Sequence, residues 1–153
     1  DARHGMARHM TMFERFLTLK NEGRFQEINA LIPYTAFVNI ELIGDASNLK
    51  TVLRQTESNT GNPTIPAVHG GVVGGLLEHT AILKVLIEGE YTRFPKIVNL
   101  SVEYLRPCLA TRDTFARGTL FKQGRSVTNV RIEAWQSDEA KPVAAAHAHF
   151  LVG

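Results

Sequence analysis

The stretch HGGVVGGLLEHTAILKVLIEGE, residues 69 to 90, decides the fold of this chain. Its pattern predicts a helix from residue 70 to about residue 88, and Gly89 is a suitable C-terminal stop. On a helical wheel of about 100° per residue, apolar side chains cover more than half of the circumference. These side chains are Val72, Val73, Leu76, Leu77, Ile82, Leu83, Leu86 and Ile87. A helix this apolar needs other elements around most of its surface.

Before this helix, the chain reads as helices followed by two strands. Residues 7 to 31 carry apolar side chains at helical spacing, with a break expected at Gly23 and an end at Pro33. Residues 37 to 44 and residues 49 to 56 then read as strands.

After these strands, the residues 57 to 66 are rich in Asn, Gly and Pro, which predicts a loop. Beyond the long helix the sequence becomes rich in β-branched and aromatic residues with alternating polarity. Four strands are expected there, over residues 97 to 105, 113 to 122, 126 to 135 and 143 to 152. This order predicts an α+β domain in which a mostly antiparallel sheet of about six strands curls around the long helix.

Composition restricts the class of protein. A chain of 153 residues with 44% hydrophobic and 21% charged residues can form one soluble domain with a real core. We find no uncharged apolar run of the ~18 residues that span a bilayer, and the N-terminal residues lack the apolar segment of a signal peptide. The single cysteine, Cys108, allows no internal disulfide. We therefore expect a cytoplasmic protein without membrane contact. The 17 Lys and Arg residues form no cluster, so we expect no nucleic-acid partner.

Glu78 lies in the middle of the apolar helix, an unusual place for a carboxylate. Gly71, Gly74 and Ala81 fall on the same helix face, so the neighbours of Glu78 are small. Burial raises the pKa of a carboxyl group and makes it a stronger base. Two interpretations are open. Glu78 is either a catalytic carboxylate beside a ligand groove, or a structural residue paired with an arginine or a backbone donor.

His69, Gly70 and Gly71 mark the start of the helix. The first N–H groups of a helix have no internal partner and carry partial positive charge, which suits an oxyanion. These donors precede Glu78 by about two helical turns, roughly 10 Å along the axis. A site shared between subunits, with the carboxylate from one chain and the donors from another, would bring them together.

The segment HGGVVGGLLEHTA, residues 69 to 81, resembles the signature of the phenylacetate-pathway (PaaI-type) hotdog thioesterases. That signature begins with HGG and carries Asp or Glu nine positions after the His. The later YLRPC and KQGR segments and the closing strand resemble the same family. The resemblance covers residues 33 to 153 and implies a hotdog fold, a curled antiparallel sheet around one central helix. Residues 1 to 32 are then an N-terminal helical extension.

The resemblance implies hydrolysis of an acyl-CoA thioester to a free acid and CoA. The acidic residue of the family falls on Glu78, as general base or nucleophile. The backbone N–H of Gly70, with that of Gly71, would polarise the thioester carbonyl, and His69 stands beside them. We therefore include His69 among the predicted catalytic residues.

Other site residues follow from the same resemblance. Family members often place an Asn six residues before the motif His, but that position here is Pro63 and Asn62 lies one residue earlier. The CoA phosphates need cationic partners, for which Arg106, Lys122 and Arg125 are candidates. We expect no metal and no separate cofactor, because CoA is part of the substrate.

The resemblance also implies a homodimer or homotetramer with active sites between subunits. Two other functions stay open. One is an acyl-CoA dehydratase or hydratase of the same fold. The segment NPTIPAVHGG, residues 62 to 71, faintly resembles the loop of those enzymes. The other is a domain that binds acyl-CoA without turnover.

Overall fold

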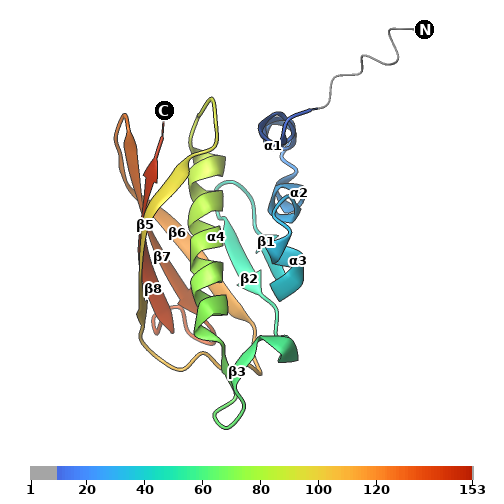
Figure 1. Ribbon diagram of the computed structural model, residues 1–153, viewed down its shortest axis with the longest axis vertical. Coiled ribbons are helices and arrows are strands. Elements are labelled where there is room, and N and C mark those ends of the chain that lie inside the picture. The colour runs from blue at the N-terminus through green and yellow to red at the C-terminus, as the bar shows by residue number, and fades with distance from the viewer. Residues whose placement is uncertain (1–9, 153) are drawn as a thin grey trace, which may run out of the picture.

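A six-stranded antiparallel sheet dominates the computed structural model, which describes residues 10–152 (Figure 1). Its strands are β1 (Ile40–Ile43), β2 (Lys50–Leu53), β5 (Lys96–Tyr104), β6 (Thr114–Gln123), β7 (Val127–Trp135) and β8 (Ala144–Leu151). They lie in the order β1-β2-β6-β7-β8-β5, and each neighbouring pair is antiparallel. The predicted sheet is confirmed, and β5 to β8 each agree with the predicted strands to within one residue at either end.

The predicted long helix is also confirmed as α4 (Gly70–Glu88), which packs across the inner face of β6, β7 and β8. Many of the strand residues that face it are alanines, which let the helix approach the sheet closely. They are Ala116, Ala134, Ala144, Ala146 and Ala148. Leu76 and Leu77 of α4 are fully buried in this layer. Burying such a side chain contributes about 1.5–3 kcal/mol.

Three short helices, α1 (Met12–Asn21), α2 (Phe25–Ala30) and α3 (Tyr34–Val38), stand beside α4 and β1 (Figure 1). The Thr11 hydroxyl caps α1 by accepting the N–H of Glu14. The break between α1 and α2 lies at Gly23, as predicted, where φ is +69°. Phe16 and Ile28 from these helices share a buried cluster with the C-terminal half of α4.

The sequence-based assignment was wrong at residues 37 to 39, which we expected to begin a strand. Instead, Pro33 starts the helix α3 rather than ending the helical region, and Asn39 terminates it with φ at +69°. Proline suits a helix start because its φ is already helical, and asparagine tolerates the left-handed conformation that ends one. The predicted loop of residues 57 to 66 is also partly structured. It contains a 3-10 turn (Glu57–Asn59), strand β3 (Thr60–Asn62) and the approach to β4 (Ala67–Val68).

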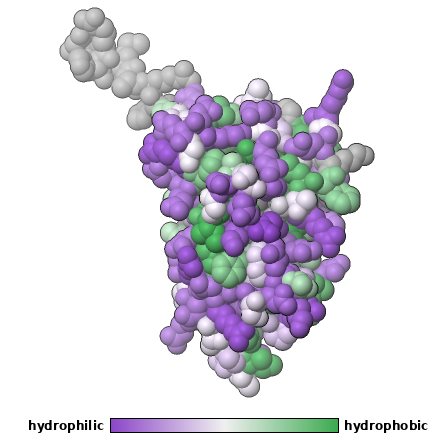
Figure 2. Space-filling view, turned by 180° about the vertical axis from the view of Figure 1, so that it is seen from behind, coloured by the Kyte–Doolittle hydropathy of each residue, from purple (hydrophilic) through white to green (hydrophobic). Residues whose placement is uncertain are grey.

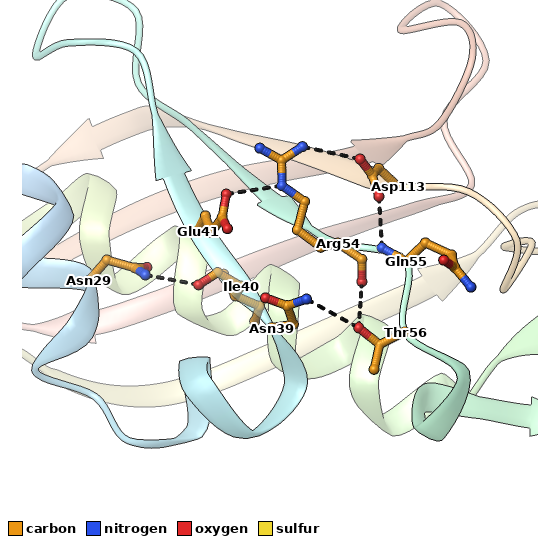
Figure 3. A network of polar contacts seen from close by, with 8 residues as sticks. All are labelled: Asn29, Asn39, Ile40, Glu41, Arg54, Gln55, Thr56 and Asp113. Carbon is orange, nitrogen blue, oxygen red and sulfur yellow. Dashed lines mark hydrogen bonds and ion pairs between the residues drawn. The ribbon is translucent and has the colours of Figure 1, made fainter.

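Polar contacts hold β1, β2 and the start of β6 together (Figure 3). Arg54, directly after β2, donates from Nε to Glu41 of β1 at 2.9 Å and from Nη1 to Asp113 at 3.1 Å. The other carboxylate oxygen of Asp113 accepts the N–H of Gln55 at 2.7 Å. These groups are partly exposed, so each ion pair contributes at most about 1 kcal/mol.

Helix α4 is long and apolar enough to cross a membrane by length and composition alone, but more than half of it is buried inside the protein. Its apolar character is therefore that of a core helix. Seen from behind, the surface is mostly hydrophilic, with smaller hydrophobic patches between the polar groups (Figure 2).

Candidate active site

One face of α4 stays incompletely buried, and Glu78 lies on it. Gly71, Gly74, Gly75 and Ile82 share this face with Glu78, at spacings of three, four and seven residues, and none of them is fully buried. We call these five residues the open face. Glu78 makes no hydrogen bond or ion pair within residues 10–152. The alternative of a structural Glu tied to an arginine therefore finds no support in the chain as described.

Two tyrosines stand over the glycines of the open face. A Cβ atom at Gly74 would lie 3.5 Å from the hydroxyl of Tyr104, on β5. A Cβ atom at Gly75 would lie 2.9 Å from Cε1 of Tyr34, on α3. Any larger residue at position 75 would therefore push the Tyr34 ring away. The glycines let Tyr34 and Tyr104 approach the helix backbone on either side of the turn that precedes Glu78.

His69 caps the helix and binds one of the two predicted oxyanion donors. Its Nδ1 accepts the N–H of Gly71 at 2.9 Å, so the proton of the neutral ring lies on Nε2. The N–H of Gly70 makes no hydrogen bond within the described part of the chain. Of the two amides, Gly70 is the one free to bind a ligand, and Gly71 is already used in the cap.

The β3–β4 hairpin fixes the turn in front of the helix. The backbone N–H of His69 donates to the carbonyl of Asn59 at 2.8 Å, and the Asn59 side chain donates to Val38 at 2.8 Å. A Cβ atom at Gly61 would lie only 2.6 Å from the His69 Cα, so only glycine allows this close approach. Asn59 and Gly61 thus support the site, and neither role was predicted from the sequence.

A cleft of about 380 Å³ lies at the start of α4 and brings Gly70 together with Arg106 and Tyr104. The Tyr104 hydroxyl donates to the Gly70 carbonyl at 2.8 Å, which holds β5 against the first turn of the helix. Arg106 is exposed and donates to the carbonyl of Pro142 at 2.7 Å. Tyr104 was also missed, although it is the first residue of the YLRPC segment. One cationic candidate thus lies beside the free amide.

The other predicted residues lie elsewhere. Asn62 is exposed, and its Oδ1 accepts the N–H groups of Thr64 at 3.0 Å and Ile65 at 3.3 Å, which stabilises the hairpin turn. Arg125 is exposed in the turn between β6 and β7. The side chain of Lys122 lies outside the described part of the structure. Asn62 is therefore engaged in its own turn within this chain.

Glu78 and Gly70 are eight residues apart on one straight helix, about 12 Å along its axis. A carbonyl that accepts a hydrogen bond from Gly70 is therefore out of reach of Glu78 in the same chain. The prediction of a site shared between two chains rests on this geometry.

His79, next to Glu78, points about 100° away around the helix axis and anchors the helix. It is buried, its Nε2 lies 2.6 Å from Asn29 Oδ1, and Asn29 in turn donates to the carbonyl of Ile40 at 2.9 Å. Burial lowers the pKa of His79 to about 4, so the ring is neutral and donates its Nε2–H to Asn29. This link joins α4 to α2 and β1. The long-range pairing with Asn29 left no signal in the sequence.

Two other possible reactive centres, the cysteine thiol and a metal site, find no support in the described residues. Cys108 is buried beside the Thr114 hydroxyl at 3.2 Å, and burial raises the pKa of its thiol, which disfavours the reactive thiolate. Within residues 10–152, no group of three or more His, Cys, Asp or Glu side chains could hold a metal ion.

A family model of the acyl-CoA thioesterase N-terminal domain matches residues 59–151, well over half of the chain. The match includes the β3–β4 hairpin, α4 and all four of β5 to β8. This chain belongs to the acyl-CoA thioesterase family. Among the curated proteins compared, none matched the sequence.

Solved structures agree with this family. A Chromobacterium violaceum protein is 36% identical, with a TM-score of 0.76 over 92% of this chain and 97% of the other. A phenylacetic acid degradation-related protein from Ralstonia eutropha JMP134 is 25% identical, with a TM-score of 0.71 over 84% of this chain and 98% of the other. Mouse thioesterase superfamily member 2, at 15% identity and a TM-score of 0.68 over 85% and 96%, shares the fold. The predicted PaaI-type resemblance and hotdog fold are confirmed.

Proposed function

We propose that this thioesterase-family protein hydrolyses acyl-CoA thioesters, with Glu78 as the catalytic carboxylate. The observation that carries the proposal is the state of Glu78 on the open face. It is half-buried, follows Gly74 and Gly75 by one helical turn, and has no hydrogen-bond or ion-pair partner within the described residues. A carboxylate that serves only to stabilise the fold would be paired, since an unpaired, partly buried charge costs free energy.

The first reaction step can follow either of two routes. As a general base, Glu78 takes a proton from water while the hydroxyl oxygen attacks the thioester carbonyl. As a nucleophile, its oxygen attacks directly and gives an anhydride, which water then opens. In both routes the Gly70 N–H stabilises the tetrahedral oxyanion. The C–S bond then breaks, and the CoA sulfur leaves as a thiolate that is protonated to the thiol.

The site needs two chains, because Gly70 and Glu78 of one chain are too far apart. Strand β5 supports such an assembly, since within residues 10–152 it is an edge strand that pairs with β8 and with no strand on its other side. Its unpaired backbone groups can bind another strand. In our proposal two copies join along β5 into a homodimer, a tetramer being a pair of such dimers. Gly70 of one copy then faces Glu78 of the other.

Coenzyme A would enter past the cleft that holds Gly70 and Arg106. Arg106 is the first choice for a phosphate partner, because it lies in the same cleft as Gly70 and a guanidinium can bind a phosphate through two hydrogen bonds. Lys122 and Arg125, at the β6–β7 turn, are the other candidates. We propose that the hydrolysis takes place in the cytoplasm and requires no metal and no additional cofactor.

The decisive experiment is Glu78→Gln, which keeps the shape of the side chain and removes its basicity. We expect kcat to fall about 10²- to 10⁴-fold, the contribution of a general base. Glu88→Gln is the matched control, because it lies on the same helix, is exposed, and pairs only with Lys84 within the described residues. Retained activity in Glu78→Gln on a panel of acyl-CoAs would refute the assignment.

The same panel separates the two other functions. Hydration of crotonyl-CoA without release of free CoA would identify a hydratase. Tight binding of acyl-CoA without turnover by the wild-type chain would identify a binding domain.

A further inference from the structure

A second, apolar cavity of about 350 Å³ lies under the N-terminal helices, away from the cleft at Gly70. Helices α1 and α2 form one wall, the C-terminal half of α4 forms another, and the segment that leads into β5 closes the side. Typical lining residues are Met12, Phe16, Leu31, Ile82, Leu86 and Phe94. No side chain that lines it carries a charge. The proposed catalytic steps do not use this cavity.

The open face of α4 leads into this cavity. Ile82 belongs to both, and it lies one helical turn after Glu78. On the other side, Ile32 and Pro33 line the cavity, and the next residue, Tyr34, stands over Gly75 one turn before Glu78. Glu78 is thus bracketed along α4 by Gly75, under Tyr34, and by Ile82, in the cavity wall. Glu78 therefore lies one helical turn from the cavity wall at Ile82.

We propose that this cavity receives the tail of the acyl group, and that the substrates are medium-chain aliphatic acyl-CoAs of about eight to twelve carbons. A cavity of about 150 Å³ is enough to hold benzene, so 350 Å³ has room for on the order of a dozen carbon atoms. The apolar lining disfavours tails with charged or unpaired polar groups, which would lose their hydration there. This inference rests on the proposed thioester hydrolysis.

The N-terminal helices have a defined role in this arrangement. The sheet provides the floor through Ile97 and Phe150, and α4 provides the inner wall. Among residues 10–152, α1, α2 and the turn after α2 close the outer side. These helices therefore set the length of tail that fits, and they act on chain-length preference rather than on the chemical step.

The test compares two methionines of the same helix region. Met12 lines the cavity, whereas Met10 does not, and both are 51% exposed, so tryptophan is tolerated at either position. Wild type should hydrolyse decanoyl-CoA at least about tenfold faster, by kcat/KM, than butyryl-CoA, since each buried methylene can contribute up to about fourfold. Met12→Trp should lower kcat/KM for decanoyl-CoA much more than kcat/KM for butyryl-CoA, and so remove most of this advantage. Met10→Trp should behave as wild type.

A second variant and a second readout keep the two proposals separate. Ile32→Trp fills the cavity from the end of α2, and it guards against the case in which the indole introduced by Met12→Trp turns outward. Independently of turnover, 11-(dansylamino)undecanoic acid should gain fluorescence on wild type, be displaced by decanoate but not by butyrate, and bind weakly to both filled variants.

The outcomes are distinguishable. Hydrolysis of all chain lengths at equal kcat/KM, or a strong preference for phenylacetyl-CoA over decanoyl-CoA, overturns the tail assignment and leaves the thioesterase proposal standing. If no acyl-CoA is hydrolysed but the dansyl probe binds in the cavity, the proposed function fails while the cavity keeps its apolar-chain specificity. Equal dansyl binding by wild type and both filled variants overturns the inference.

Discussion

The two faces of α4 differ in how completely their side chains are buried and paired. The buried face carries Val73, Leu76 and Leu77, which are fully buried against the sheet, and His79, whose ring has a partner in Asn29. The open face carries three glycines and a carboxylate that has no partner among residues 10–152. The first face is filled by this chain, and we propose that a substrate and a second chain fill the second.

This difference shows where the sequence departs from what stability requires. A glycine inside a helix costs about 1 kcal/mol relative to alanine, and the open face has Gly74 and Gly75 in adjacent positions. A half-buried carboxylate without a partner adds a further cost. On the buried face such choices are absent. Residues that weaken the fold are concentrated around Glu78, as expected for a site that has to accommodate a substrate or a second chain.

After Glu78→Gln, the largest effect is expected from Gly70→Pro, which removes the amide that we assign to the oxyanion. Proline fits the first position of a helix, and His69, with φ at −55° and ψ at 131°, already has the extended conformation that precedes proline. We expect kcat to fall about 10²- to 10³-fold, with little change in the melting temperature. Gly70→Ala keeps the N–H and is the control, since its Cβ would lie 3.6 Å from Tyr104, an ordinary contact.

Mixing subunits sharpens the same comparison. When Glu78→Gln and Gly70→Pro chains are unfolded together and refolded, each mixed dimer regains one intact site if the site is shared between chains. About one quarter of wild-type activity should then return, because half of the dimers are mixed and each has one working site of two. No recovery, despite mixed dimers shown by mass spectrometry, would mean that each site is built within one chain.

A smaller effect, on stability alone, is expected from the buried face. The pKa of His79 is about 4 in the folded chain, against about 6.5 when unfolded, so the unfolded chain binds more protons between these values. The free energy of unfolding should therefore be highest above pH 6.5 and fall by about 3 kcal/mol at most as the pH drops to 4. Urea denaturation at several pH values measures this. In His79→Gln, whose amide can still donate to Asn29, that part of the pH dependence should disappear, and an unchanged slope would contradict the assignment.

The sequence predicts the buried face far better than the open one. The apolar spacing of residues 72 to 87 predicts both the helix and the sheet around it, because burial acts on every turn alike. Glu78 was found because a carboxylate inside that pattern is conspicuous. Tyr34, Tyr104 and the His79–Asn29 link could not be found, since they depend on segments that are far apart in the chain. The helix α3 was missed for a different reason, because Pro33 was interpreted as a helix end and Asn39 as part of a strand.

The smallest effect is expected from Gly74→Ala, which tests why the open face is rich in glycine. An added Cβ would lie 3.5 Å from the Tyr104 hydroxyl, an ordinary contact, so alanine should fit and raise the free energy of unfolding by up to about 1 kcal/mol. It should also lower kcat/KM, because the methyl group takes up space on the open face one turn before Glu78, where we propose that the substrate binds. Gly75→Ala is the contrast, since its Cβ would lie 2.9 Å from Tyr34 and should give no such gain in stability. A loss of stability in Gly74→Ala would show that this glycine serves packing. Packing would then determine the residues on both faces of α4.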